Sequence, residues 1–235
     1  MKGIDLLQKE LHSLGSPEKA AFLSRFFKTG KGQYGEGDLF LGVTMPEIRT
    51  VVGQYSHLSP KEWQLLLHNP YHEIRMTSLI GLMKCFQKAK KFPKIQRQIF
   101  EFYLANLDYI NNWDLVDVTC RNIVGAYLFK RDRDILYELA QHPHLWAQRV
   151  AIVSTWYFIK NNQFSDTLKI AELLLTHSHD LIHKAVGWML REVGKRDDLV
   201  LEEFLDTYTL QMPRTTLRYA IERFPESKRK YYLSL

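Results

Sequence analysis

Apolar residues recur along this chain at steps of three and four positions, the spacing that places side chains on one face of a helix. One such series runs through residues 74–86 and another through residues 150–157. No stretch shows the alternation of apolar and polar residues that predicts a half-buried strand. The pattern therefore predicts an all-α fold of about a dozen helices, each of two to four turns and joined by short loops.

Proline and glycine mark the expected helix ends. In three segments, residues 16–18, 44–47 and 59–62, a proline stands beside a capping residue and a glutamate follows in the first turn. Residues 29–38 differ, because four glycines within this stretch predict a mobile loop. The loop lacks the preceding strand and the Gly-Lys-Ser/Thr sequence of a phosphate-binding loop. It either approaches a DNA backbone or simply connects two helices.

Four helical segments resemble one another: residues 72–79, 146–153, 181–188 and 215–222. Each carries a basic residue before a run of small apolar residues, at Arg75, Arg149, Lys184 and Arg218. The spacing is about 35 residues, with room for one further unit after the first, and this period is typical of helical-pair solenoids. We therefore expect a HEAT-like helical-pair solenoid that forms a single domain over residues 1–235, with a concave basic face.

The four basic residues are expected to form a row on that face. Any one of them alone could lie with its aliphatic stem along a helix pair, but four in register favour a groove that follows DNA. The formal net charge of +6 agrees with a polyanionic partner, although it also serves solubility.

The N-terminal residues, the length of the apolar runs and the two cysteines indicate the cellular compartment. Residues 1–10 have the pattern of an amphipathic helix, not of a secretory signal, and no apolar run is long enough to span a membrane. Cys85 and Cys120 each lie in an apolar helical stretch, where reduced thiols are expected. We expect a cytoplasmic protein.

Residues 111–117 carry the most informative chemistry. Asn112 is a good N-cap residue, and Trp113 and Asp117 are four positions apart, so they share a helical face with Asp114 close by. Packing, together with a favourable charge at a helix N-terminus, would explain the same residues. Trp188 follows Lys184 by four positions and is expected on the same surface as that lysine.

Tryptophan is usually a core residue, and Trp63, Trp146 and Trp156 are expected in the core. His177, His179 and His183 have a spacing that a metal could use. Their position at a helix start favours solvent-facing side chains, so no metal site is expected.

Four segments together, residues 41–49, 113–117, 146–152 and 184–192, resemble the AlkD-type alkylpurine DNA glycosylases of the DNA alkylation repair enzyme family. The resemblance extends over most of the chain, from residue 17 to residue 224. It implies that Asp117 is catalytic, that Trp113 and Trp188 surround the damaged nucleotide, and that Arg149 holds the DNA backbone beside it. Further DNA contacts are expected from Lys184, Arg191, Arg218 and Arg75.

The implied activity is hydrolysis of the N-glycosidic bond of N3- or N7-alkylated purines by a monofunctional DNA glycosylase. Such a base is already cationic, so it leaves without a general acid, and one carboxylate can stabilise the sugar cation and orient water. Neither a metal nor another cofactor is required. The expected partner is duplex DNA containing alkylated purines, bound by a monomer.

Asn112 stands where a second aromatic residue is found in the well-known family pattern. Two alternatives stay open. One is a catalytically silent HEAT-repeat protein that binds branched or damaged DNA, and the other is a HEAT adaptor that binds a partner protein.

Overall fold

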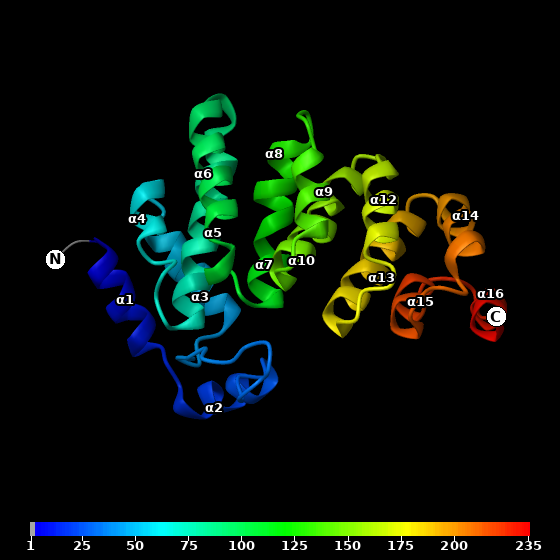
Figure 1. Cartoon of the computed structure of the whole chain (residues 1–235). Coiled ribbons are helices and arrows are strands. Elements are labelled where there is room, and N and C mark those ends of the chain that lie inside the picture. Colours follow the sequence, from blue (N-terminus) through cyan, green and yellow to red (C-terminus); the bar gives the residue numbers. More distant parts are fainter. Residues whose placement is uncertain (1–2) are drawn as a thin grey trace. The chain divides into compact units, whose positions relative to one another are not determined.

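The computed structural model describes residues 3–235 (Figure 1). Within this range the regular structure is helical, and only one isolated parallel bridge, between Leu39 and Tyr71, has the pairing of a sheet. The all-α prediction is therefore confirmed. The chain divides into two compact units, an N-terminal unit that ends at Thr119 and a C-terminal unit that begins at Cys120.

The N-terminal unit contains seven of the α-helices in the described range, together with two short 3-10 turns. The helices are α1 (Gly3–Ser13), α2 (Pro17–Phe26), α3 (Met45–Gln54), α4 (Pro60–Gln64), α5 (His72–Lys88), α6 (Pro93–Ala105) and α7 (Trp113–Cys120), and the turns are η1 (Ala89–Lys91) and η2 (Leu107–Tyr109).

The predicted capping signals of this unit act as expected. Ser16 accepts a hydrogen bond from the backbone N–H of Lys19 at the start of α2. Capping boxes begin α3, with Thr44 and Glu47, and α4, which starts after Ser59. Each of these helices also has proline in its first turn, where the missing N–H costs nothing.

The helices of the C-terminal unit are η3 (Arg121–Gly125, a π-helical turn), α8 (Ala126–Leu128), α9 (Asp134–Gln141), α10 (Leu145–Ser154), α11 (Trp156–Ile159), α12 (Ser165–Leu173), α13 (Asp180–Gly194), α14 (Asp198–Tyr208), α15 (Arg214–Ala220) and α16 (Glu226–Ser234). The three helices that carry the repeated basic residue, α10, α13 and α15, pack in succession, α10 on α13 and α13 on α15. Helix α9 packs on α10, and α12 and α14 pack on α13. Within this unit the predicted helical-pair repeat is confirmed.

Two of the three tryptophans expected in the core lie there, since Trp63 and Trp146 are buried. Trp156 is only half-buried. The guanidinium of Arg121 lies 4.8 Å from the centre of its ring, so one part of the indole faces a cation instead of apolar side chains.

A glycine permits the close approach of α13 and α15. A Cβ atom placed on Gly187 would lie 2.5 Å from the carbonyl oxygen of Thr216 and 2.5 Å from the Cβ of Tyr219. A similar contact occurs at Gly125, where a Cβ would lie 2.2 Å from the carbonyl oxygen of Ser154. Because these are backbone contacts, a methyl group at either position requires a helix to move.

We predict that Gly187→Ala destabilises the protein by about 1–3 kcal/mol, because overpacking outweighs the better helix propensity of alanine. Gly53→Ala in α3 is the matched control, since a Cβ there meets nothing within 4 Å. The control should be neutral or more stable by up to about 1 kcal/mol. Urea unfolding of both variants measures the difference, and equal stabilities would contradict this account of the α13–α15 contact.

Candidate active site

Helix α7 carries the two N-terminal-unit residues of the expected site. Asn112 directly precedes the helix, and its Oδ1 accepts a hydrogen bond from the backbone N–H of Trp113 at 2.9 Å. Asn112 thus occupies the predicted N-cap position, and it is fully buried. Trp113 and Asp117 follow on the same helical face, one turn apart, and both are half-buried.

Two phenylalanines of the N-terminal unit contact the indole of Trp113. Its ring centre lies 5.3 Å from that of Phe27 and 6.0 Å from that of Phe26. Phe26 is itself 51% exposed and stacks on Phe22, which is also exposed. One side of Trp113 is therefore supported by the protein, at the margin of an exposed aromatic patch on α2.

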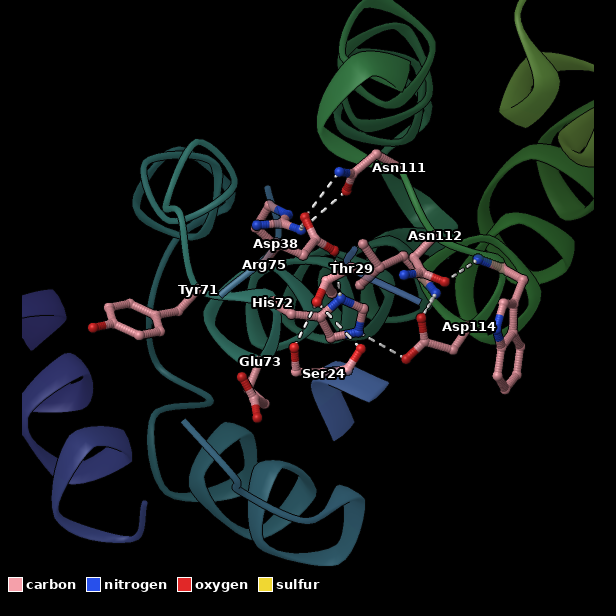
Figure 2. Close-up of polar contacts among 12 residues, drawn as sticks. Ser24, Thr29, Asp38, Tyr71, His72, Glu73, Arg75, Asn111, Asn112 and Asp114 are labelled. Atoms are coloured by element: carbon pink, nitrogen blue, oxygen red, sulfur yellow. Dashed lines mark hydrogen bonds and ion pairs between the residues drawn. The ribbon is translucent and has the colours of Figure 1, made fainter. Parts of the chain in front are cut away.

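Beside the segment that leads into α7 lies a buried group of charges that the sequence pattern did not indicate (Figure 2). Arg75 of α5 donates from Nη2 to Oδ1 of Asp38 at 2.7 Å and to Oδ1 of Asn111 at 3.0 Å. Asn111 also donates from Nδ2 to Oδ1 of Asp38 at 2.9 Å. Burial works to raise the pKa of Asp38, but hydrogen bonds from His72 and Asn111 and the charge of Arg75 hold it below its ordinary value.

His72, the first residue of α5, joins this group to α7. Its Nδ1 lies 3.3 Å from Oδ2 of Asp38, and its Nε2 lies 2.8 Å from Oδ2 of Asp114 (Figure 2). The rings of Phe27 and Phe40 stack on the imidazole at centre distances of 5.0 and 4.8 Å. Burial lowers the pKa of His72, but the two carboxylates outweigh it and raise the pKa to about 9. The imidazole is therefore charged at neutral pH.

Glu73, next along α5, holds the segment that leads into α3. Its carboxylate accepts hydrogen bonds from the backbone N–H groups of Leu41, Gly42 and Val43 at 3.0, 2.8 and 3.3 Å. Gly42 has a φ of +83°, and a Cβ there would lie 2.1 Å from the carbonyl oxygen of Ser16. Only glycine suits this position, because both the conformation and the space exclude a side chain.

These contacts also anchor the glycine-rich loop. Asp38 is the last residue of the loop, and its side chain belongs to the buried charge group. The backbone of the next residue, Leu39, pairs with the segment that leads into α5. Earlier in the loop, the N–H of Gly32 donates to Glu36, and the N–H of Gly35 donates to the carbonyl oxygen of Lys28. Whether the loop contacts DNA stays a prediction.

The C-terminal unit carries five expected residues on its three packed helices: Arg149, Lys184, Trp188, Arg191 and Arg218. On α13, Lys184 pairs with Asp180 at 2.7 Å, Trp188 is half-buried one turn later, and Arg191 binds Glu222. Lys184 is 40% exposed. Arg218 on α15 is exposed.

Two of the four basic residues expected in the solvent-facing row are buried. Arg149 on α10 is 5% exposed and donates to the carbonyl oxygen of Leu181. Arg75 is 4% exposed, and its Nη1 donates to the carbonyl oxygens of Asn69 and Pro70. The prediction of a surface row is wrong for both residues, because the guanidinium of Arg75 neutralises buried Asp38 and that of Arg149 is bound to a backbone carbonyl oxygen.

The sequence missed Asp38, His72 and Glu73 because their partners are distant along the chain. Nothing in the sequence indicates that Asp38 and Asp114 accept hydrogen bonds from the same imidazole. One signal lay in the first turn of α5. His72, Glu73 and Arg75 are all buried there, and residues of these polar types are rarely buried without partners.

The described range, residues 3–235, contains no helix long and apolar enough to cross a membrane. Within the same range no three side chains of histidine, cysteine, aspartate or glutamate are grouped so that they could hold a metal ion.

Comparison with known proteins identifies the family. The sequence matches the family model described as DNA alkylation repair enzyme over residues 7–224. The chain belongs to the DNA alkylation repair enzyme family. A solved structure described as a predicted DNA alkylation repair enzyme from Enterococcus faecalis shares the fold, with a TM-score of 0.67 and 17% sequence identity over 90% of this chain and 97% of that chain. No curated protein matches the sequence.

Membership of the DNA alkylation repair enzyme family supports a role in DNA repair, with damaged DNA as the substrate. The solved structure shows that the fold extends over nearly the whole length of both chains.

We predict that Arg75→Leu destabilises this family member by about 3–5 kcal/mol, because the substitution leaves buried Asp38 without its guanidinium partner. Arg218→Leu is the matched control on an exposed side chain, and its stability should change by less than about 0.5 kcal/mol. Urea unfolding at neutral pH measures both. Similar losses in the two variants would contradict the structural role of Arg75.

Proposed function

We propose that this protein is a monofunctional DNA glycosylase that releases cationic N3- or N7-alkylated purines from duplex DNA. The observation that carries the proposal is the placement of Trp113 and Asp117 one turn apart on a face of α7, in a chain that matches the repair family over residues 7–224. The protein acts as a monomer and needs neither a metal nor another cofactor.

Asp117 is the catalytic carboxylate of the proposal. An alkylated purine that already carries a positive charge leaves without protonation, so the enzyme has to stabilise mainly the cation that grows on the deoxyribose. A half-buried carboxylate suits this task, because partial exclusion of water strengthens its interaction with a cation while a water molecule can still be oriented for attack.

Trp113 supplies an indole ring to this cationic centre, and Trp188 is the second tryptophan that the family resemblance assigns to the damaged nucleotide. Each ring contributes roughly 0.5–2 kcal/mol to the binding of a cation over its face. Support of Trp113 by Phe26 and Phe27 favours this role, because a ring held by neighbours loses little freedom when the substrate binds. Trp188 is half-buried on α13 and belongs to the C-terminal unit.

The DNA backbone is bound by basic residues of the three packed helices of the C-terminal unit. Lys184 and Arg218 have exposed side chains, and Arg191 lies about two helical turns beyond Lys184 and is held by Glu222. The ion pair of Lys184 with Asp180 is at the surface, so exchanging it for a phosphate costs little. Arg149, whose guanidinium is held by the Leu181 carbonyl, takes the phosphate beside the lesion.

We predict that Asp117→Asn slows release of N7-methylguanine from duplex DNA by roughly 100-fold or more, because the amide keeps the shape of the side chain but loses the charge. Asp198→Asn, at an exposed position in the first turn of α14, is the control and should release base at the wild-type rate. Single-turnover assays with enzyme in excess measure the step.

Equal rates for wild type and Asp117→Asn would rule out the proposed mechanism. Tight binding of duplex DNA by the wild type without any release of base would instead favour a silent DNA-binding protein. DNA affinity and thermal melting are measured for each variant so that lost binding and lost folding are both recognised.

We predict that DNA affinity falls steeply with salt, with a log–log slope of about −0.9 for each phosphate contact. Arg218→Ala should make the slope shallower by about one contact. Arg131→Ala, which removes an equal charge from an exposed side chain outside α10, α13 and α15, should leave the slope unchanged. Identical slopes for wild type and Arg218→Ala would argue for the protein-binding adaptor.

A further inference from the structure

We infer that His72 is a positioning residue for base excision: hydrogen-bonded at one ring nitrogen to Asp38 and at the other to Asp114, it fixes the start of α7 and with it Trp113 and Asp117. The inference rests on the proposed function. It adds a residue that the sequence pattern and the resemblance did not assign, together with a dependence on pH.

The geometry makes His72 a connection between three segments that are distant along the chain. Asp38 closes the glycine-rich loop, His72 begins α5, and Asp114 lies in the first turn of α7 (Figure 2). Nε2 makes the shorter contact, 2.8 Å, to Asp114. Removing the imidazole would therefore remove the hydrogen bond between α5 and the first turn of α7, while the bond from Arg75 to Asn111, two residues before Trp113, would stay.

Asp114 can transmit this constraint to the reacting side chains. While its Oδ2 contacts His72, its Oδ1 accepts the N–H of the next residue, Leu115, at 2.8 Å, so the carboxylate is fixed to its own helix. Trp113 precedes Asp114 directly, and Asp117 follows it on the adjoining turn of α7. A displacement of about 1 Å at a site of this kind can change a rate by about 100-fold.

Both bonds exist together only when the imidazole is charged. A neutral imidazole has one N–H, whereas two carboxylate oxygens here require two donors. The charged groups that face the ring are Asp38 from the loop, Asp114 from α7, and Arg75 of α5, which opposes the charge. Lys19 of α2 and Glu73 of α5 line the same apolar cavity of 350 Å³ as His72 and Asp114.

The sign of the pH dependence follows from the raised pKa of His72, about 9 against an ordinary value of 6.5. The contribution of the charged imidazole is fully present below about pH 6.5 and is lost as the pH rises through about 9. The link between His72 and α7 should therefore hold at neutral pH and weaken in mild alkali, and the excision rate should fall there.

The test compares His72→Gln with His68→Gln. Glutamine cannot carry the charge, and Arg75 and Asn111 still bind Asp38 in this variant. His68 is an exposed histidine of the same unit that binds Asn106 and stacks on Tyr109, neither of which belongs to α7. Single-turnover release of N7-methylguanine is measured from about pH 6.5 to 10, with spontaneous release subtracted at each pH.

A second readout does not depend on catalysis. The protein is labelled with 5-fluorotryptophan, and the ¹⁹F resonance of Trp113 is assigned by its loss in Trp113→Phe. In the wild type this resonance should shift with a midpoint near pH 9, together with the fall in rate. In Asp114→Asn both midpoints should move to lower pH, because the charge that raises the pKa of His72 has been removed.

We expect His72→Gln to release base about 10-fold or more slowly at neutral pH, with no alkaline fall and with a Trp113 resonance that no longer titrates. His68→Gln should match the wild type in all three respects. A lower melting temperature of His72→Gln with an unchanged rate and an unchanged Trp113 resonance would overturn the inference and leave His72 a structural residue.

Failure of the proposed function can be told apart from failure of this inference. If the wild type releases no base at any pH, the glycosylase proposal fails, and the Trp113 resonance alone decides whether His72 positions α7. If the wild type is active but its Trp113 resonance titrates equally in His72→Gln, the glycosylase proposal stands and the role of His72 is wrong.

Discussion

The structure of the N-terminal unit depends on a buried set of charges that must be satisfied together. Asp38, Arg75 and His72 are nearly excluded from solvent, where an isolated charge would be strongly unfavourable. Each is stable only because the others are present, so the glycine-rich loop, the start of α5 and the start of α7 are held as one arrangement. Such a set contributes little net stability, but it strongly disfavours any arrangement in which one partner is missing.

The C-terminal unit is organised by a different constraint, the close approach of helices. Gly125 permits the close approach of η3 and the end of α10, and Gly187 permits that of α13 and α15, in both cases where a methyl group would clash. The helices α10, α13 and α15 pack in succession. This packing places the repeated basic positions on neighbouring helices. Repetition sets the position of each side chain on its helix, but local contacts set its exposure: Arg149 is covered and bound to a carbonyl oxygen, whereas Arg218 faces solvent.

The two constraints bear differently on the proposed chemistry. In the proposed function, DNA backbone binding uses flexible surface cations, which tolerate small shifts because phosphate attraction acts over several ångströms. Stabilisation of a cation on the sugar requires a carboxylate and indole rings in defined positions. The structure agrees with this difference between the two tasks. Trp113 and Asp117 lie on a short helix whose first turn is held by a charged hydrogen bond, whereas Lys184 and Arg218 lie on the surface.

The sequence by itself determined the helices, their caps and the helical-pair repeat of the C-terminal unit. These features depend on side-chain periodicity and on contacts between residues close along the chain, as at Ser16 and Ser59. It also indicated that Trp113 and Asp117 share a face, because four positions make about one turn of a helix. Only the tertiary structure decided that Arg75 neutralises Asp38 inside the protein and that His72 joins the glycine-rich loop to α7. Those bonds connect segments more than thirty positions apart, and the burial that makes them strong exists only after the helices have packed.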